Sequence, residues 1–133
     1  MREIKFRAWL IPDKEMVEVL AIAFDEALIH FETKDNKTDW WSKVHFELMQ
    51  FTGLRDRNKK EIYEGDILKW KFKPELVYIC KYDVGGFYIE ANIDPFKHND
   101  KKIDELFITT NELDNCEIIG NTYENPELLK QDK

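Results

Sequence analysis

The sequence predicts a mainly β fold: a single antiparallel β domain with one or two short helices near the C-terminus. Apolar and charged residues alternate with a period of two along several stretches, as they do in half-buried strands. β-branched and aromatic residues gather in the same stretches, and aromatic residues make up 14% of the chain. Clusters of Pro, Gly, Asp and Asn separate these stretches and are typical of turns.

The length of the chain favours a single core. It has 133 residues, of which 43% are hydrophobic, and neither an internal repeat nor a Gly/Ser-rich linker divides it. We therefore expect one domain over residues 1–133, folded without the help of a disulfide or a metal.

The N-terminal part predicts a strand and its hairpin partner. Ile4, Phe6 and Ala8 fall on one side of an extended chain, with charged residues between them. Pro12 supplies a turn, after which the run VEVLAIAF can pair back onto the first strand. The good helix formers between Glu15 and Glu32 leave a helix as the alternative.

Two later stretches repeat the alternation. The faces expected to point inward carry Val44, Phe46 and Leu48 in the first stretch, and Leu68, Trp70 and Phe72 in the second. Pro74 is expected to end the strand after the second stretch, because proline cannot donate a hydrogen bond to a strand ladder. The runs LVYICKY and FYIEANI then flank the turn sequence DVGG and predict a hairpin.

The C-terminal part loses the period of two. We expect a short helix over Lys102–Leu113, followed by a last strand in CEIIGNTYE. Asn125, with Pro126 and an acidic residue after it, has the pattern of a helix start.

The segment Phe51–Trp70, FTGLRDRNKKEIYEGDILKW, contains two closely spaced corners around a very short strand at Glu61–Tyr63. Gly65 can adopt a positive φ, and Asp66 can accept hydrogen bonds from nearby backbone, so both are expected to form a structural turn. Corners this close together suit a small SH3-like barrel over Phe51–Ile93.

Three segments carry a resemblance to a known family: the start MREIKFRAW, the middle LMQFTGLRDRNKKEIYEGDIL and the end EIIGNTYENPELL. In their order and spacing they resemble the YopX-like proteins of phages and prophages of Gram-positive bacteria. The resemblance implies a mainly β fold and a phage or prophage origin, and it carries no catalytic residue over to this chain. Such proteins commonly have glycine where this chain has Lys59, so Asn58 is expected to carry the positive φ of the first corner.

The sequence offers no recognisable catalytic, cofactor or metal site. Ser42 lacks a nucleophile elbow around it. Cys80 and Cys116 are isolated and are expected to be reduced and buried. The histidines are far apart in the sequence, and no glycine-rich phosphate loop is present. We therefore expect a protein that is not an enzyme and uses no cofactor.

Charge and hydropathy narrow the partners. The net charge of -7 opposes nonspecific attachment to nucleic acid or anionic membranes. The first residues lack the apolar core of a secretion signal, and no apolar run approaches a membrane span. We therefore expect a cytoplasmic protein, and the resemblance to phage and prophage proteins implies that the cell is a bacterial host.

One candidate binding surface combines aromatic and basic side chains. Its residues are Trp40, Trp41, Arg55, Arg57, Lys69 and Lys71. They could stack bases and hold phosphates, which makes a nucleic-acid-binding small β-barrel module the alternative function. In the competing interpretation Trp70 and at least one of Trp40 and Trp41 belong to the core, and the lysines keep a strand edge soluble. We favour a non-enzymatic phage or prophage accessory protein that binds a protein partner or itself as a homo-oligomer.

Overall fold

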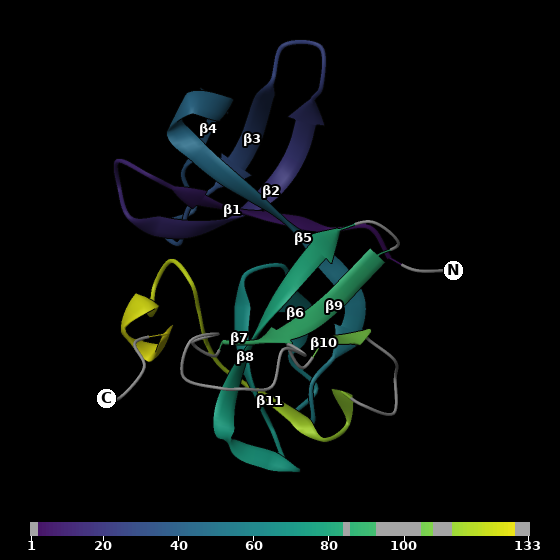
Figure 1. Cartoon of the computed structure of the whole chain (residues 1–133). Coiled ribbons are helices and arrows are strands. Elements are labelled where there is room, and N and C mark those ends of the chain that lie inside the picture. The colour runs from purple at the N-terminus through teal and green to yellow at the C-terminus, as the bar shows by residue number, and fades with distance from the viewer. Residues whose placement is uncertain (1–2, 84–85, 93–104, 108–112, 130–133) are drawn as a thin grey trace. The chain divides into compact units, whose positions relative to one another are not determined.

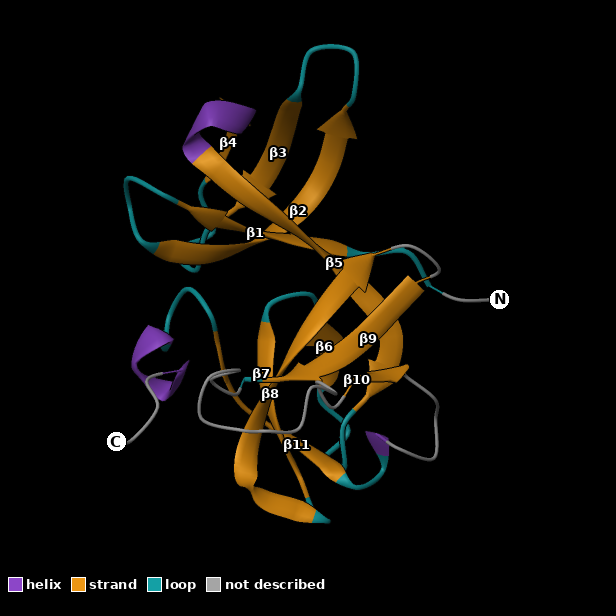
Figure 2. Ribbon diagram, viewed as in Figure 1, coloured by secondary structure: helices purple, strands orange, loops and turns teal. Residues whose placement is uncertain are grey.

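The computed structural model describes residues 3–83, 86–92, 105–107 and 113–129. The chain divides into two compact units, Met1–Phe51 and Thr52–Lys133. Both are built from antiparallel strands (Figures 1 and 2), so the predicted mainly β fold is confirmed. The single domain stays a prediction, because a division into compact units does not decide whether the two unfold together.

The first unit contains β1 (Phe6–Leu10), β2 (Glu15–Ala23), β3 (Leu28–Glu32), β4 (Thr38–Ser42), the 3₁₀ helix η1 (Lys43–His45) and the start of β5 (Phe46–Arg55). The strand order of this sheet is β4-β3-β2-β1-β5-β6. Ala8 lies opposite Val17, which confirms the expected N-terminal hairpin. The helix alternative is wrong, because β2 and β3 form a second hairpin with Ile22 opposite Ile29.

The core of the first unit lies on one face of these strands. Its buried residues are Ala8, Leu10, Val17, Ile29, Phe31 and Phe46. Of the inner face predicted for the following stretch, only Phe46 belongs to this core. Val44 lies in η1, where the extended alternation is interrupted, and Leu48 is exposed. The prediction for these two residues is therefore wrong.

The second unit contains the end of β5 and then β6 (Glu61–Tyr63), β7 (Asp66–Trp70), β8 (Lys73–Asp83), β9 (Gly86–Ala91), β10 (Glu105–Phe107), β11 (Cys116–Asn121) and the 3₁₀ helix η2 (Pro126–Leu129). The strand order of its own sheet is β10-β9-β8-β7-β11. The predicted hairpin of β8 and β9 is confirmed, with Cys80 opposite Ile89. The last predicted strand is present as β11 and pairs with β7, where Ile118 lies opposite Leu68. It ends at Asn121, and residues 122–124, which were expected in the strand, form a turn.

Three sequence predictions about this unit change. Within the described strands the sheet is open and not a closed barrel, so the SH3-like barrel is not confirmed. Glu105–Phe107 is a strand and not part of a helix, while most of the rest of that predicted helix lies outside the described residues. Among the described residues after Asn125, Pro126–Leu129 form the 3₁₀ helix η2, so the predicted C-terminal α-helix is not confirmed.

The turn between β7 and β8 also falls earlier than expected. It lies at Lys71 and Phe72, with Trp70 opposite Lys73, so Pro74 is inside β8 and is not the break. Phe72 is consequently exposed at the turn instead of pointing inward.

The second core is separate from the first. Its buried residues are Ile62, Leu68, Tyr78, Cys80, Ile89, Ala91, Leu113 and Cys116. Fully burying one aliphatic side chain such as Leu68 contributes about 1.5–3 kcal/mol. Ile62 belongs to this core, so β6, the short strand between the two corners, is anchored in it.

Candidate functional site

The first corner of the Phe51–Trp70 segment is a tight hairpin loop between β5 and β6. The Asp56 N–H donates to the Lys60 carbonyl at 2.9 Å, and the Lys59 N–H donates to the Asp56 carbonyl at 3.0 Å. Lys59 has a φ of 69°, the left-handed conformation that follows a type I turn in such loops. The prediction that Asn58 carries the positive φ is therefore wrong, since the loop geometry requires it one residue later.

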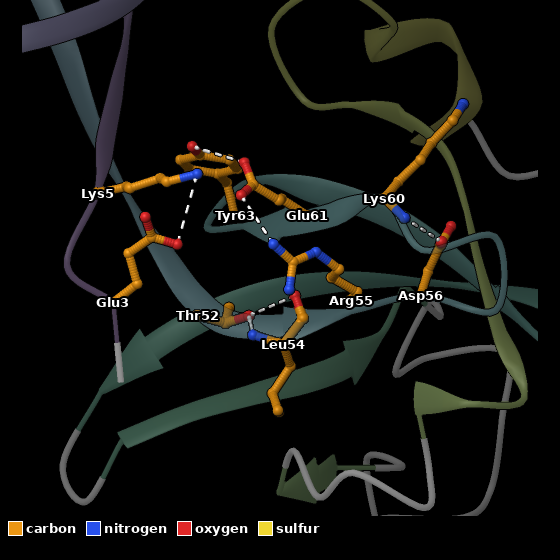
Figure 3. Close-up of polar contacts among 9 residues, drawn as sticks. All are labelled: Glu3, Lys5, Thr52, Leu54, Arg55, Asp56, Lys60, Glu61 and Tyr63. Atoms are coloured by element: carbon orange, nitrogen blue, oxygen red, sulfur yellow. Dashed lines mark hydrogen bonds and ion pairs between the residues drawn. The ribbon is translucent and has the colours of Figure 1, made fainter. Parts of the chain in front are cut away.

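The Asp56 side chain connects this corner to the last strand. It is 2% exposed, and its Oδ1 accepts the N–H groups of Asn58 at 2.8 Å and Lys60 at 2.9 Å (the latter in Figure 3). Its Oδ2 accepts the N–H of Ile118 in β11 at 2.9 Å. A hydrogen bond to a charged group contributes about 1.5–3 kcal/mol. The three bonds make Asp56 a clamp that holds the first corner against β11.

The second corner is joined to its neighbours in a similar way. Gly65 has a φ of 86°, and the Asp66 Oδ2 accepts the Tyr63 N–H at 2.7 Å. The Gly65 N–H donates to the Cys80 carbonyl at 2.9 Å, and the Gly65 carbonyl accepts the Thr122 N–H at 2.8 Å. The corner therefore bonds to both β8 and the segment after β11.

A third turn, which sequence reasoning did not single out, follows β11. The Asn121 Oδ1 accepts the N–H groups of Tyr123 at 3.0 Å and Glu124 at 2.8 Å. The Asn125 Oδ1 accepts the Asn121 N–H at 3.2 Å. A Cβ on Gly120 would lie 2.6 Å from that same Oδ1. The run GNTYENP, dense in turn-forming residues, is the signal that could have revealed this turn.

The aromatic half of the candidate surface lies in the first unit. Trp41 packs against the first core, edge-on to Phe31 with ring centroids 5.3 Å apart. The Trp41 Nε1–H donates to the Asp39 Oδ2 at 3.2 Å. Trp40 is 49% exposed and stacks on the His30 ring, with centroids 4.7 Å apart and planes 10° from parallel. Trp40 is therefore the member of the pair whose ring faces solvent.

The basic half lies in the second unit, beside acidic residues. The Arg55 Nη2 is 3.4 Å from the Glu61 Oε2 (Figure 3). Lys69 is exposed on β7 and lies directly opposite Glu117 of β11. Opposite charges this close offset part of the local positive field.

Arg57 and Lys71 use their backbone to join β11 and the chain just before it. The Arg57 N–H donates to the Cys116 carbonyl at 2.9 Å, and the Lys71 N–H donates to the Asn115 carbonyl at 2.9 Å. The Lys71 Nζ lies 5.8 Å from the centroid of the Phe72 ring. The six residues predicted for one surface thus divide between the two units.

The described residues show no group of three or more His, Cys, Asp and Glu side chains that could hold a metal ion. Cys80 and Cys116 are free thiols buried in the second core, as expected. None of the helices in the described part of the chain is both long and apolar enough to cross a membrane.

The geometry defines a two-sheet β protein in which buried Asp and Asn side chains satisfy turn and strand backbone. The chain belongs to the YopX family, described as YopX protein, which it matches over residues 5–130. This confirms the resemblance seen in the three sequence segments.

The fold is similar to that of a solved protein. The crystal structure of protein EF1440 from Enterococcus faecalis matches with a TM-score of 0.66 and 29% identity, covering 98% of this chain and 100% of that one. No curated protein matches the chain.

Proposed function

We propose that this YopX-family chain is a non-enzymatic accessory protein of a phage or prophage that binds a protein partner through the outer face of its first sheet. The observation that carries the proposal is the exposed Trp40 ring, held flat on His30. Large aromatic side chains dominate the binding energy of protein interfaces. A ring that is already ordered loses less entropy when a partner covers it.

The neighbours of Trp40 indicate the chemistry of this partner. In the strand register, Ala21, His30 and Trp40 form one row across β2, β3 and β4. Glu18 and Glu32 lie opposite each other in the next row on the same face. A complementary partner presents an apolar pocket for the indole ring and Lys or Arg beside it.

The non-enzymatic part of the proposal is supported by the two buried acidic residues of the family segments. The carboxylates of Asp56 and Asp66 are both buried and accept backbone N–H groups within the fold. A carboxylate engaged in this way serves the backbone and is poorly placed for general acid or base chemistry on a substrate.

Affinity capture from host cells during phage induction tests the proposal. Wild type, Trp40→Ala and Phe72→Ala serve as bait, and each captured protein is then purified and titrated against all three. Phe72 is the matched control, because it is an exposed aromatic residue of the second unit. We expect Trp40→Ala to weaken binding about tenfold or more, which corresponds to a loss of about 1.4 kcal/mol or more of binding free energy. Phe72→Ala should leave the affinity unchanged. Equal affinities for wild type and Trp40→Ala would overturn the proposal.

Nucleic-acid binding is the second candidate, and the turn between β7 and β8 favours it. Phe72 is exposed there with the Lys71 ammonium near its ring, a pairing that could stack a base and hold a phosphate. Fluorescence anisotropy with labelled single-stranded DNA or RNA decides the matter. Micromolar binding that weakens about tenfold between low salt and about 0.2 M, and is lost when Arg55, Arg57, Lys69 and Lys71 are reversed in charge, would favour this candidate over protein binding.

A further inference from the structure

Among the strands that the structure describes, β4 is the last at one end of the first sheet, so none of them pairs with its outer edge, which we call the free edge. On the inner side, the Lys43 N–H donates to the Ala27 carbonyl at 3.0 Å, and the Thr33 N–H donates to the Lys37 carbonyl at 2.8 Å. Antiparallel pairs alternate between bonded and non-bonded, so the odd-numbered residues of β4 face β3. The residues whose N–H and C=O groups point to the free edge are therefore Thr38, Trp40 and Ser42.

The central donor of this edge is already occupied. The Trp40 N–H donates to the Asp39 Oδ1 at 2.7 Å, and the Trp41 indole N–H donates to the Asp39 Oδ2 at 3.2 Å. The second bond holds the carboxylate in place, since Trp41 is itself packed against the first core. Asp39 thus presents a fixed negative charge on the edge of the sheet.

We infer that Asp39 keeps the β4 edge closed to a second copy of this chain. Unpaired strand edges are templates for pairing with identical strands. In the antiparallel register that places Trp40 opposite its own counterpart, Thr38 faces Ser42 of the other copy, and the two Trp40 residues form the central bonded pair. Their exposed rings would then add a cross-strand aromatic contact. The edge is self-complementary except at Asp39.

Asp39 opposes this pairing in two ways. Each copy must first give up the bond between the Asp39 carboxylate and the Trp40 N–H. The two carboxylates are then brought to one shared edge, and a charge that loses one of its hydrogen bonds in an interface is costly. This inference does not rest on the proposed protein partner. It implies that any homo-oligomer of the wild-type chain forms through a surface other than the β4 edge.

Ser42 provides a way to close the edge by a different route. Its backbone has φ −83° and ψ 161°, which proline can adopt, and its N–H points to the free edge and not to β3. Ser42→Pro therefore removes an edge donor without breaking the ladder with β3.

Sedimentation velocity over a range of concentrations up to about 100 μM tests the inference. The proteins are wild type, Asp39→Ala, the double variant Asp39→Ala/Ser42→Pro, and the control Asp35→Ala, which removes the same charge from a neighbouring loop. Of the four proteins, we expect only the single variant Asp39→Ala to self-associate more strongly than wild type. Its dissociation constant should be about tenfold or more below that of wild type. Asp39→Ala that associates no more than wild type, or association that Ser42→Pro does not reverse, would overturn the inference.

Amide hydrogen exchange of the wild-type protein provides a second test that requires no variant to fold. We expect the Trp40 amide to exchange about tenfold or more slowly than the amides of Thr38 and Ser42 on the same edge, because only its N–H has a carboxylate acceptor. Trp40 exchange as fast as that of Thr38 and Ser42 would overturn the inference.

Discussion

The hairpin loops Thr33–Lys37 and Asp56–Lys60 have nearly the same backbone but different roles. In each, the N–H of the first residue donates to the carbonyl of the last, at 2.8 Å and 2.9 Å respectively. The residue before the last is left-handed in both, Asn36 with φ 63° and Lys59 with φ 69°. The first residue also accepts the N–H of the last through its side chain in both loops.

The difference lies in that first side chain. Thr33 has one side-chain oxygen, which accepts the Lys37 N–H at 3.2 Å within its own loop. Asp56 has two, and the second accepts the N–H of Ile118, 62 residues away in the sequence. An Asp in place of a Thr at the first position of an otherwise ordinary hairpin loop is therefore enough to connect that loop to the last strand.

Removing the Asp56 and Thr33 side chains should lower the free energy of unfolding by unequal amounts. Asp56→Ala deletes three hydrogen bonds to a buried carboxylate, and we expect the free energy of unfolding to fall by about 3–5 kcal/mol. Thr33→Ala is the matched control and should cost only about 0.5–1 kcal/mol, because one local bond is lost. Urea denaturation of both variants measures these values, and equal losses would contradict the comparison.

The second corner should be the next most sensitive position. Gly65→Val places a β-branched side chain at φ 86°, which we expect to cost about 1–3 kcal/mol in backbone strain. Lys69→Val, on the exposed side of β7, is the control and should change little, because valine suits strands. A thermal melt of Gly65→Val within about a degree of wild type would show that the corner is not strained.

The smallest effect should come from making the two loops more alike. Lys59 is left-handed, and Asn tolerates that conformation better than Lys does. Lys59→Asn reproduces the arrangement at Asn36 and should raise the free energy of unfolding by up to about 1 kcal/mol. Asn36→Lys, the reverse change, should lower it by a similar amount. A destabilised Lys59→Asn would mean that the Lys59 side chain has a role beyond the loop.

The local parts of the fold were predictable from the sequence. The bounds of the short strand Glu61–Tyr63 follow from the corners on either side, and the hairpins follow from turn residues between alternating runs. The left-handed conformation was predicted at the wrong residue. Asn adopts it more readily than Lys, whereas the spacing of the loop requires it at Lys59.

The long-range parts were not predictable. Nothing near Asp56 in the sequence shows that its carboxylate accepts the N–H of Ile118, and a single sequence cannot show that β11, and not β6, pairs with β7. The candidate surface was predicted from residue types alone, which do not show which residues lie near each other. The structure assigns Trp40 and Trp41 to one unit and the four basic residues to the other.

Amide exchange at Ile118 in the variant Asp56→Thr tests the clamp most directly. Threonine can keep the loop bond that Thr33 makes, but it lacks the second oxygen that the Ile118 N–H needs. We predict that exchange at Ile118 accelerates about tenfold or more beyond any change at Ile89, a buried residue of the same unit. Exchange at Ile118 that changes no more than at Ile89 would contradict the conclusion that Asp56 holds the first corner against the last strand.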